Sequence, residues 1–188
     1  MTSIELSMRK FVAIFFTMCA IFTSYSCTEK SKLTKVMQAF NETKVVIPDD
    51  LECVYNKEIS KINLDTLKSN KFIFYYDSLS CSSCRISHLI DIYPLYEMSD
   101  TSKFSILTIF SPRQSELESV RLQLKLLNHS IPVYLDCCGS FSHTNSKIPE
   151  DQRFHNFLID NNGTPIFVGN PLSSMKLKEL FINILHKH

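Results

Sequence analysis

Residues 71–84 read KFIFYYDSLSCSSC, and this stretch decides the fold. Its first part is rich in β-forming residues, and a continuous apolar run of this kind is typical of a strand buried on both faces. A turn over 78–80 follows. A helix is then expected over 82–93, where Pro94 would kink or end it. The apolar face expected for that helix comprises Ile86, Leu89, Ile90 and Tyr93.

The residues downstream alternate between strand and helix patterns. Ser115 and Glu118 form a candidate capping box for the clearest helix, whose apolar stripe is Leu117, Val120, Leu124 and Leu127. Asn-Gly at 162–163 lies between two β runs and predicts a hairpin. The expected elements are strands 104–110, 131–136, 154–160 and 164–169, helices 115–128 and 173–187, and an N-terminal edge strand or hairpin from 45–48 and 51–55.

This order is β-α-β-α-β followed by a β-hairpin and a C-terminal helix. The first half requires right-handed crossovers and a parallel sheet, and the hairpin adds antiparallel strands to it. The sequence therefore predicts an α/β fold with a mixed central sheet. The final helix is expected to present Met175, Leu177, Leu180, Phe181 and Ile184 on one face.

Composition limits the function classes. The chain has 188 residues, which suits one domain with an extension. It carries 20 Lys and Arg against 19 Asp and Glu, scattered without a basic run. A nucleic-acid-binding surface is therefore not expected.

The first residues have the pattern of an export signal. A short basic start at 8–10 precedes an apolar run over 11–22 and small polar residues up to Cys27. This pattern predicts a signal peptide over 1–26. A single short membrane anchor is the alternative, although the run is shorter than the roughly 20 residues of a membrane span.

Cys27 follows small residues at the end of the apolar run, an arrangement that resembles a bacterial lipobox in relaxed form. The resemblance implies that Cys27 is acylated and becomes the mature N-terminus. Residues 27–42 would then be a lipidated tether, and 43–188 the folded domain. The expected location is the bacterial cell envelope, with the domain held on a membrane by lipid and facing the periplasm or the cell exterior.

The chain has 7 cysteines, at 19, 27, 53, 81, 84, 137 and 138. Cys19 would leave with the signal peptide, and acylation would remove Cys27 from the thiol pool. The five that remain are an odd number, so at least one is free or pairs with another molecule. Export implies a compartment in which disulfides persist.

The spacing of Cys81 and Cys84 suits a disulfide. Residues three apart on a helix are neighbours, with Cβ atoms about 5–6 Å apart. A disulfide needs Cα atoms about 5.5–6 Å apart, so little backbone movement is required. Cys81 lies where the helix begins, and free N–H groups there stabilise a thiolate. We therefore expect Cys81 to attack a substrate disulfide and Cys84, one turn deeper, to resolve the intermediate.

A buried strand, a turn, Cys81-Ser82-Ser83-Cys84 and a helix, in this element order, resemble the thioredoxin-like fold over residues 43–188. The similarity is greatest to exported thiol–disulfide oxidoreductase and redoxin-type lipoproteins, whose Phe-Leu-Ile-Asp-x-x-Gly hairpin matches residues 157–163. Residues 76–84 and 169–171 also resemble signatures of uncharacterised thioredoxin-like bacterial lipoproteins. The resemblance implies a three-layer fold, a protein dithiol or disulfide as partner, and no nucleotide or metal cofactor.

Several residues depart from the family pattern. Thioredoxin-like enzymes place a cis-proline before the strand facing the redox pair, and that place falls at Phe154 or His155 here. Ser82 and Ser83 replace the usual Gly-Pro. These departures keep open a binding or structural lipoprotein without redox turnover, in which the disulfide is structural. A zinc site with His88 nearby is a further alternative, although such a site needs four ligands.

Four auxiliary residues are candidates. Ser78 lies three before Cys81, where thiol peroxidases carry Thr or Ser, but their preceding Pro is Phe74 here, so a peroxidase-like redoxin is a weaker alternative. Cys137 and Cys138 follow a predicted strand. One of them could exchange with the Cys81–Cys84 pair or with Cys53, or both could be loop thiols without a role. His155 would lie near the redox pair if the cis-proline alignment holds, or would be one polar residue on a strand.

Overall fold

The computed structural model describes residues 32–102, 104–127 and 131–187. The chain divides into two units, Met1–Ala39 and Phe40–His188, and residues 32–39 of the first are helical. The expected signal peptide and Cys27 lie outside the described residues. Within those ranges no helix is both long and apolar enough to cross a bilayer.

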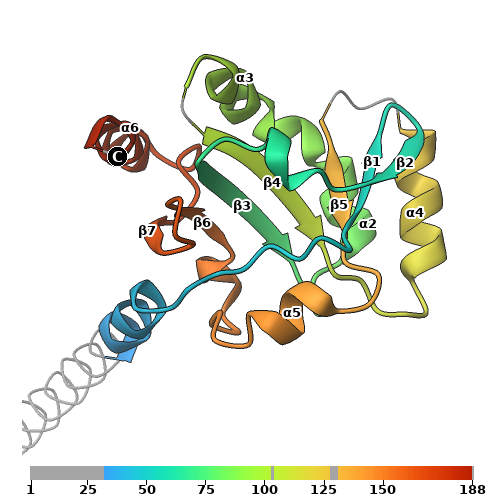
Figure 1. Ribbon diagram of the computed structural model, residues 1–188, viewed down its shortest axis with the longest axis horizontal. Helices are drawn as coiled ribbons and strands as arrows, with labels where there is room; N and C mark the ends of the chain where they lie inside the picture. The colour runs from blue at the N-terminus through green and yellow to red at the C-terminus, as the bar shows by residue number, and fades with distance from the viewer. Residues whose placement is uncertain (1–31, 103, 128–130, 188) are drawn as a thin grey trace, which may run out of the picture. The chain divides into compact units, whose positions relative to one another are not determined.

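In the described residues, seven strands form one mixed sheet in the order β2-β1-β5-β4-β3-β6-β7 (Figure 1). β3, β4 and β5 run parallel, and all other neighbours are antiparallel. The α/β class and the predicted β-α-β-α-β order with its closing hairpin and helix are confirmed. The strands are β1 (Glu52–Tyr55), β2 (Glu58–Lys61), β3 (Asn70–Tyr76), β4 (Phe104–Phe110), β5 (Val133–Leu135), β6 (Asn156–Ile159) and β7 (Pro165–Val168).

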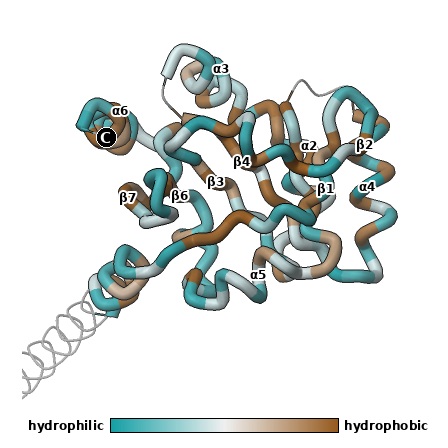
Figure 2. Tube along the Cα trace, viewed as in Figure 1, coloured by the Kyte–Doolittle hydropathy of each residue, from teal (hydrophilic) through white to brown (hydrophobic). Residues whose placement is uncertain are grey.

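The sheet is covered on both faces, which makes three layers. One face packs against α2 (Ser82–Ser87), α3 (Tyr93–Thr101), α4 (Leu117–Leu126) and α6 (Met175–Lys187). The other packs against α5 (Ser140–Thr144) and the segment 40–51, which Figure 1 shows crossing in front of the sheet. Figure 2 shows hydrophobic residues along β4 and along that crossing segment. Short 3-10 turns complete the chain at η1 (Leu64–Thr66), η2 (Leu89–Ile92) and η3 (Gln152–Phe154).

Strand β3 is buried on both faces, as its continuous apolar run predicts. Phe72 and Phe74 belong to the core under the α2 to α4 layer, whereas Ile73 and Tyr75 belong to the core under α5. Side chains alternate between the two faces of a strand, so a fully apolar run feeds both cores. β3 lies between β4 and β6, and the loop that carries Cys81 leaves the sheet at the carboxyl end of β3.

The helix predicted over 82–93 is divided into α2, the 3-10 turn η2 and α3. Its buried apolar residues lie three apart, at Ile86, Leu89, Ile92 and Leu95. This spacing follows the three-residue period of a 3-10 turn rather than the α-helical period. The predicted face was therefore wrong at Ile90 and Tyr93, which are 70% and 39% exposed. Pro94 lies in the first turn of α3 instead of ending a helix, because a missing N–H is tolerated there.

The capping box predicted for α4 does not form. The helix begins after Glu116, which makes no side-chain capping bond. Glu118 instead pairs with Arg121 one turn along the helix. The predicted stripe is buried at Leu117, Val120 and Leu124, whereas Leu127 lies past the helix end and is exposed.

The N-terminal hairpin lies later in the sequence than one of the two predicted runs. β1 confirms the strand expected near 51–55, but its partner is β2 rather than residues 45–48. β2 is exposed along its length, so it has no apolar pattern by which it could be found. The turn between the strands places Asn56 and Lys57 at positive φ.

The second hairpin matches its prediction closely. Oδ1 of Asp160 accepts hydrogen bonds from the N–H groups of Asn162 and Thr164, both at 2.8 Å. Gly163 supplies the positive φ that the turn requires, at 81°. The turn is tied to the segment before β1, because the Val45 N–H donates to the Gly163 carbonyl at 2.8 Å.

Helix α6 packs against the sheet through Phe181, and Leu177 and Ile184 of the predicted stripe are partly buried against the same core. Phe181 is fully buried, and its ring contacts those of Phe72, Phe104 and Phe167, with centroids 5.3–5.5 Å away. Met175 and Leu180, predicted on the buried face, are 71% and 49% exposed.

Candidate functional site

The loops that follow β3, β4 and β5 meet at one edge of the sheet. The Ser111 N–H donates to the Tyr76 carbonyl, and the Asp136 N–H to the Phe110 carbonyl, each at 2.8 Å. Arg113 Nε donates to the Ser78 carbonyl at 3.2 Å. The carboxyl ends of parallel strands therefore bring the segment before Cys81 and the segment after Asp136 to the same edge.

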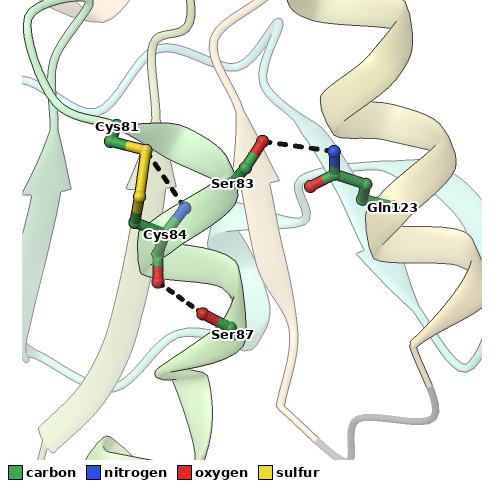
Figure 3. Close-up of a disulfide and its surroundings, with 5 residues drawn as sticks. All are labelled: Cys81, Ser83, Cys84, Ser87 and Gln123. Atoms are coloured by element: carbon green, nitrogen blue, oxygen red, sulfur yellow. Dashed lines mark hydrogen bonds between the residues drawn. A yellow bond between two sulfur atoms is a disulfide. The ribbon is translucent and has the colours of Figure 1, made fainter.

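Cys81 and Cys84 form a disulfide at the start of α2, with Cα atoms 5.3 Å apart (Figure 3). Cys81 is the N-cap residue, and the Cys84 N–H donates to its Sγ at 3.3 Å. Both cysteines are exposed residues. The disulfide therefore lies at the surface of the domain.

Hydrogen bonds fix the short helix that carries the disulfide. Ser87 Oγ donates to the Cys84 carbonyl at 2.7 Å. Gln123 of α4 donates to Ser83 Oγ at 3.2 Å, a contact that Figure 3 shows between the two helices. Ser82 is 3% exposed, and its hydroxyl has no hydrogen-bond partner among the described residues.

Asp77 organises the turn that leads to Cys81. Its Oδ1 accepts from the Leu79 N–H at 3.2 Å, and from the N–H and hydroxyl of Ser80 at 2.9 and 2.8 Å. Gln152, just before β6, donates to Ser80 Oγ at 3.3 Å. The carboxylate thus holds the strand-to-helix turn in shape, and Ser80 joins it to the β6 side.

His155 is placed beside the disulfide segment. It precedes β6, is 4% exposed, and lines a cavity of about 150 Å³ together with Ser80 and Arg85. Its Nε2 is 2.9 Å from the Pro149 carbonyl, and its ring centroid is 5.1 Å from that of Tyr75. Its Nδ1 has no hydrogen-bond partner in the described part of the chain.

The position at which thioredoxin-like enzymes carry a cis-proline has a trans peptide bond here. Across the described ranges every peptide bond is trans, those of Phe154 and His155 included. A trans bond is the default for a residue other than proline, because the cis form costs about 3–4 kcal/mol. The surface beside the disulfide on this side is therefore built from the His155 region rather than from a proline.

Ser78, Cys137 and Cys138 line a different cavity, of about 220 Å³, with Asp136. Tyr75 lines both this cavity and that of His155. The auxiliary candidates thus separate into two sites on either side of one aromatic residue.

Asp136 is the polar centre of the second cavity. It is 3% exposed and accepts from Ser111 Oγ at 2.8 Å. Burial raises the pKa of Tyr75 nearby, and the carboxylates of Asp77 and Asp136 raise it further, against hydrogen bonds from Ser111 and Ser142. Sequence reasoning did not select Asp136 itself, although a carboxylate directly after a buried strand is a usable signal.

Cys137 and Cys138 differ in their surroundings. Cys138 is exposed. Cys137 is half-buried, with its Sγ 3.5 Å from a donor nitrogen of Arg121 and 3.8 Å from the Leu135 carbonyl. Burial raises the pKa of Cys137 to about 11, with the Glu52 charge adding to the rise and Arg121 opposing it.

Cys53, Cys137 and Cys138 are free thiols in the described residues. Cys53 lies in β1 and packs against the core under α5, whereas Cys137 packs against the core on the opposite face of the sheet. Burial raises the pKa of Cys53 as well. Exchange between one of these thiols and the Cys81–Cys84 pair stays a prediction.

The residues considered for a zinc site are separate in space and in bonding. Cys81 and Cys84 are bonded to each other, and His88 Nδ1 lies 3.0 Å from Asp91 on the exposed surface. Throughout the described ranges no three His, Cys, Asp or Glu side chains gather as metal ligands would.

One solved structure supports the fold, and others match this chain with lower scores. The structure of a protein from Chlorobium tepidum, designated a thiol:disulfide interchange protein DsbE, superposes with a TM-score of 0.50 at 15% identity, over 76% of this chain and 98% of that one. A conserved protein of unknown function from Bacteroides fragilis matches at a TM-score of 0.45 and 19% identity, over 75% and 97% of the two chains. An uncharacterised thioredoxin-like protein from Porphyromonas gingivalis matches at 0.44 and 16%, over 76% and 92%.

No protein-family model and no curated protein sequence matches this chain. The structural similarity, taken with the strand order and the Cys81–Cys84 disulfide, shows a thioredoxin-like fold. The predicted fold is confirmed.

Proposed function

We propose that this thioredoxin-like chain is a thiol–disulfide oxidoreductase that works through Cys81 and Cys84. One observation carries the proposal: the two cysteines are exposed residues, are bonded to each other, and lie at the start of α2 at the carboxyl edge of the parallel strands. In open α/β sheets this edge is where ligands bind. An exposed disulfide at this position is accessible to a protein partner.

The exchange needs no group beyond the two thiols and a partner. In the reduced chain, the Cys81 thiolate attacks one sulfur of a substrate disulfide, and the other sulfur leaves as a thiolate that takes a proton. The Cys84 thiolate then attacks the Cys81 sulfur of the mixed disulfide. The second substrate thiol leaves, and the Cys81–Cys84 bond forms. Two electrons pass from the dithiol to the substrate, and the reverse sequence oxidises a partner dithiol.

The local geometry suits both steps. Residues three apart at a helix start are neighbours, with Cβ atoms about 5–6 Å apart, so ring closure in the reduced chain requires little backbone movement. The Cys84 N–H is directed at Cys81 Sγ at 3.3 Å. If this contact persists after reduction, it stabilises the attacking thiolate by a charge-assisted hydrogen bond.

A lipid on Cys27 is the second part of the proposal, and its support is the sequence pattern at 8–27. The lipid would hold the domain at the envelope membrane, where a membrane-facing or exported dithiol protein would be its partner. Metabolic labelling with radioactive palmitate tests this part. The full chain should incorporate label and its Cys27→Ala variant should not, and equal labelling of both would refute acylation at Cys27.

The redox potential of the Cys81–Cys84 pair tests the catalytic part. The full chain is equilibrated in graded glutathione buffers, quenched by alkylation, and read by site-resolved mass spectrometry. A potential between about −120 and −270 mV is that of working oxidoreductases. In the Cys84→Ser variant, mixed disulfides should accumulate on Cys81. A reduction potential below about −300 mV would mean that glutathione cannot reduce the bond. The disulfide would then be structural, and turnover would be refuted.

A binding or structural protein without redox turnover is the second candidate. The trans peptide bonds at Phe154 and His155, and the Ser82-Ser83 pair, favour it. A peroxidase-like redoxin receives less support, since Ser78 lines the cavity of Cys137 and Cys138 and Phe74 is buried in the core.

A further inference from the structure

The cavity of His155 adjoins the segment that carries the disulfide. It holds about 150 Å³ and is open to solvent. This is enough for a carboxylate on a short methylene chain. The polar residues that line it and enter the argument are Ser80, Arg85, Gln152, His155, Asn156 and Asn170.

Arg85 and Asp91 are the two residues of the cavity lining that carry a formal charge with neutral histidines, and their charges cancel, so binding of an anion depends on the surroundings of Arg85. Asp91 is the single acidic residue in the lining, and that carboxylate lies 3.0 Å from His88, which also lines the cavity. Arg85 lies over the Tyr76 ring, with its guanidinium carbon 5.6 Å from the ring centroid. Of the carboxylates in the described residues, none forms an ion pair with Arg85.

The remaining polar groups can complete an anion site. Asn170 Oδ1 accepts from the Leu172 N–H at 2.9 Å, so the amide NH2 is the group that Asn170 has left to offer. Asn156 and Gln152 add two further side-chain amides to the lining. An approaching carboxylate would therefore meet donors from four places: α2, the η3 turn before β6, the start of β6, and the loop after β7.

His155 supplies an independent observation. Its Nδ1 is buried and has no hydrogen-bond partner among the described residues, although buried polar atoms are nearly always paired. Because Nε2 faces the Pro149 carbonyl at 2.9 Å, Nε2 carries the hydrogen, and Nδ1 accepts in the neutral ring or donates in the protonated one. His155 lines the cavity while its Nδ1 stays covered, and only a protonated ring would offer that atom as a donor to an anion.

We propose that this cavity is a carboxylate site beside the disulfide, in which Arg85 and the side-chain amides bind an acidic group of the substrate. That the bound group belongs to a substrate rests on the proposed oxidoreductase function. The substrate class is then a disulfide, or a dithiol, that carries a carboxylate close to its sulfur. Arg85 acts as a binding residue and takes no part in the transfer of electrons.

Three small disulfides of different charge test the site. The reduced full chain is mixed with 3,3′-dithiodipropionate, a dianion, with bis(2-hydroxyethyl) disulfide, which is neutral, or with cystamine, a dication. Oxidation of Cys81 and Cys84 is followed by alkylation and mass spectrometry. Each rate is divided by that of dithiothreitol with the same disulfide, which removes the intrinsic reactivity of the probe.

The normalised rate should be at least threefold higher for the dianion than for the neutral probe, and cystamine should be slowest. Arg85→Gln should abolish this preference for the dianion over the neutral probe. A preference of about threefold is what one solvent-exposed charge pair provides. Arg113→Gln is the matched control: it removes an equal charge at the same edge, but Arg113 does not line the cavity. Equal normalised rates for the dianion and neutral probes, or an equal loss in both variants, would overturn the carboxylate site while the oxidoreductase function stands.

A binding measurement separates the two proposals if no probe reacts. The oxidised full chain is titrated with propionate, and the side-chain N–H signals of Arg85 and of the lining amides are followed by NMR. Saturable shifts that disappear in Arg85→Gln and persist in Arg113→Gln support the carboxylate site even if turnover is absent. Shifts that are absent, or identical in all three chains, refute it.

Discussion

The two neighbouring thiols after β5 should react at very different rates, and the pH dependence of alkylation measures the difference. Cys138 is exposed. Cys137 is half-buried, and burial, with the nearby Glu52 charge, raises its pKa to about 11 in spite of Arg121. The thiolate is the reactive form, so a raised pKa withholds Cys137 from reaction at neutral pH.

The size of the effect follows from the thiolate fractions. At pH 8 a thiol of pKa about 11 is about 0.1% thiolate, against about 24% for an unperturbed thiol of pKa about 8.5. The smaller thiolate fraction alone would slow Cys137 about 240-fold. A thiolate of higher pKa is the stronger nucleophile, with a slope of about 0.4–0.5 in log rate per pKa unit, and this offsets about 10- to 20-fold of the slowing. Cys137 should therefore be alkylated about 10- to 25-fold more slowly than a free peptide thiol. Between pH 8 and pH 10 its rate should rise about 90-fold, against about fourfold for the peptide.

Iodoacetamide labelling of the full chain with tandem mass spectrometry gives the two rates separately. Labelling in urea is the control, because both thiols should then react alike. Glu52→Gln should accelerate Cys137, since it removes a charge that raises the pKa, whereas Glu118→Gln should leave the rate unchanged. A Cys137 that reacts at pH 8 as fast as the peptide thiol would show that burial and Glu52 do not raise its pKa.

Two further predictions concern the stability of the scaffold. Phe181→Ala should lower the free energy of unfolding in urea by about 3–5 kcal/mol, because it empties the one fully buried contact of α6, whereas Leu180→Ala, at 49% exposure, should cost under about 1 kcal/mol. Gly163→Ala should lower the free energy of unfolding more than Gly139→Ala. Both glycines have positive φ, which costs another residue about 1–2 kcal/mol, but only at 163 would the new Cβ lie 2.3 Å from the Val45 carbonyl oxygen. Equal losses within either pair of variants, measured by the same unfolding titration, would contradict the packing described here.

The elements found from sequence are those with a strong local period. A continuous apolar run identified β3 and β4 as strands buried on both faces, and the Asn-Gly turn located the hairpin of β6 and β7. β2 and α5 were missed because the first is exposed along its length and the second is only five residues long. A local pattern can be read only where burial imposes it.

The sequence by itself determined that Cys81 and Cys84 can bond, because a three-residue spacing at a helix start fixes the distance between them. It did not determine which other side chains share a cavity with that segment. Ser78, three residues from Cys81, lines the cavity of Cys137, whereas His155 lines the one that includes Arg85. These neighbours come from segments about 60 to 70 residues apart in the chain, and only the order and direction of the strands bring them together. Spacing along the chain carries no record of such contacts, so the tertiary structure alone decides them.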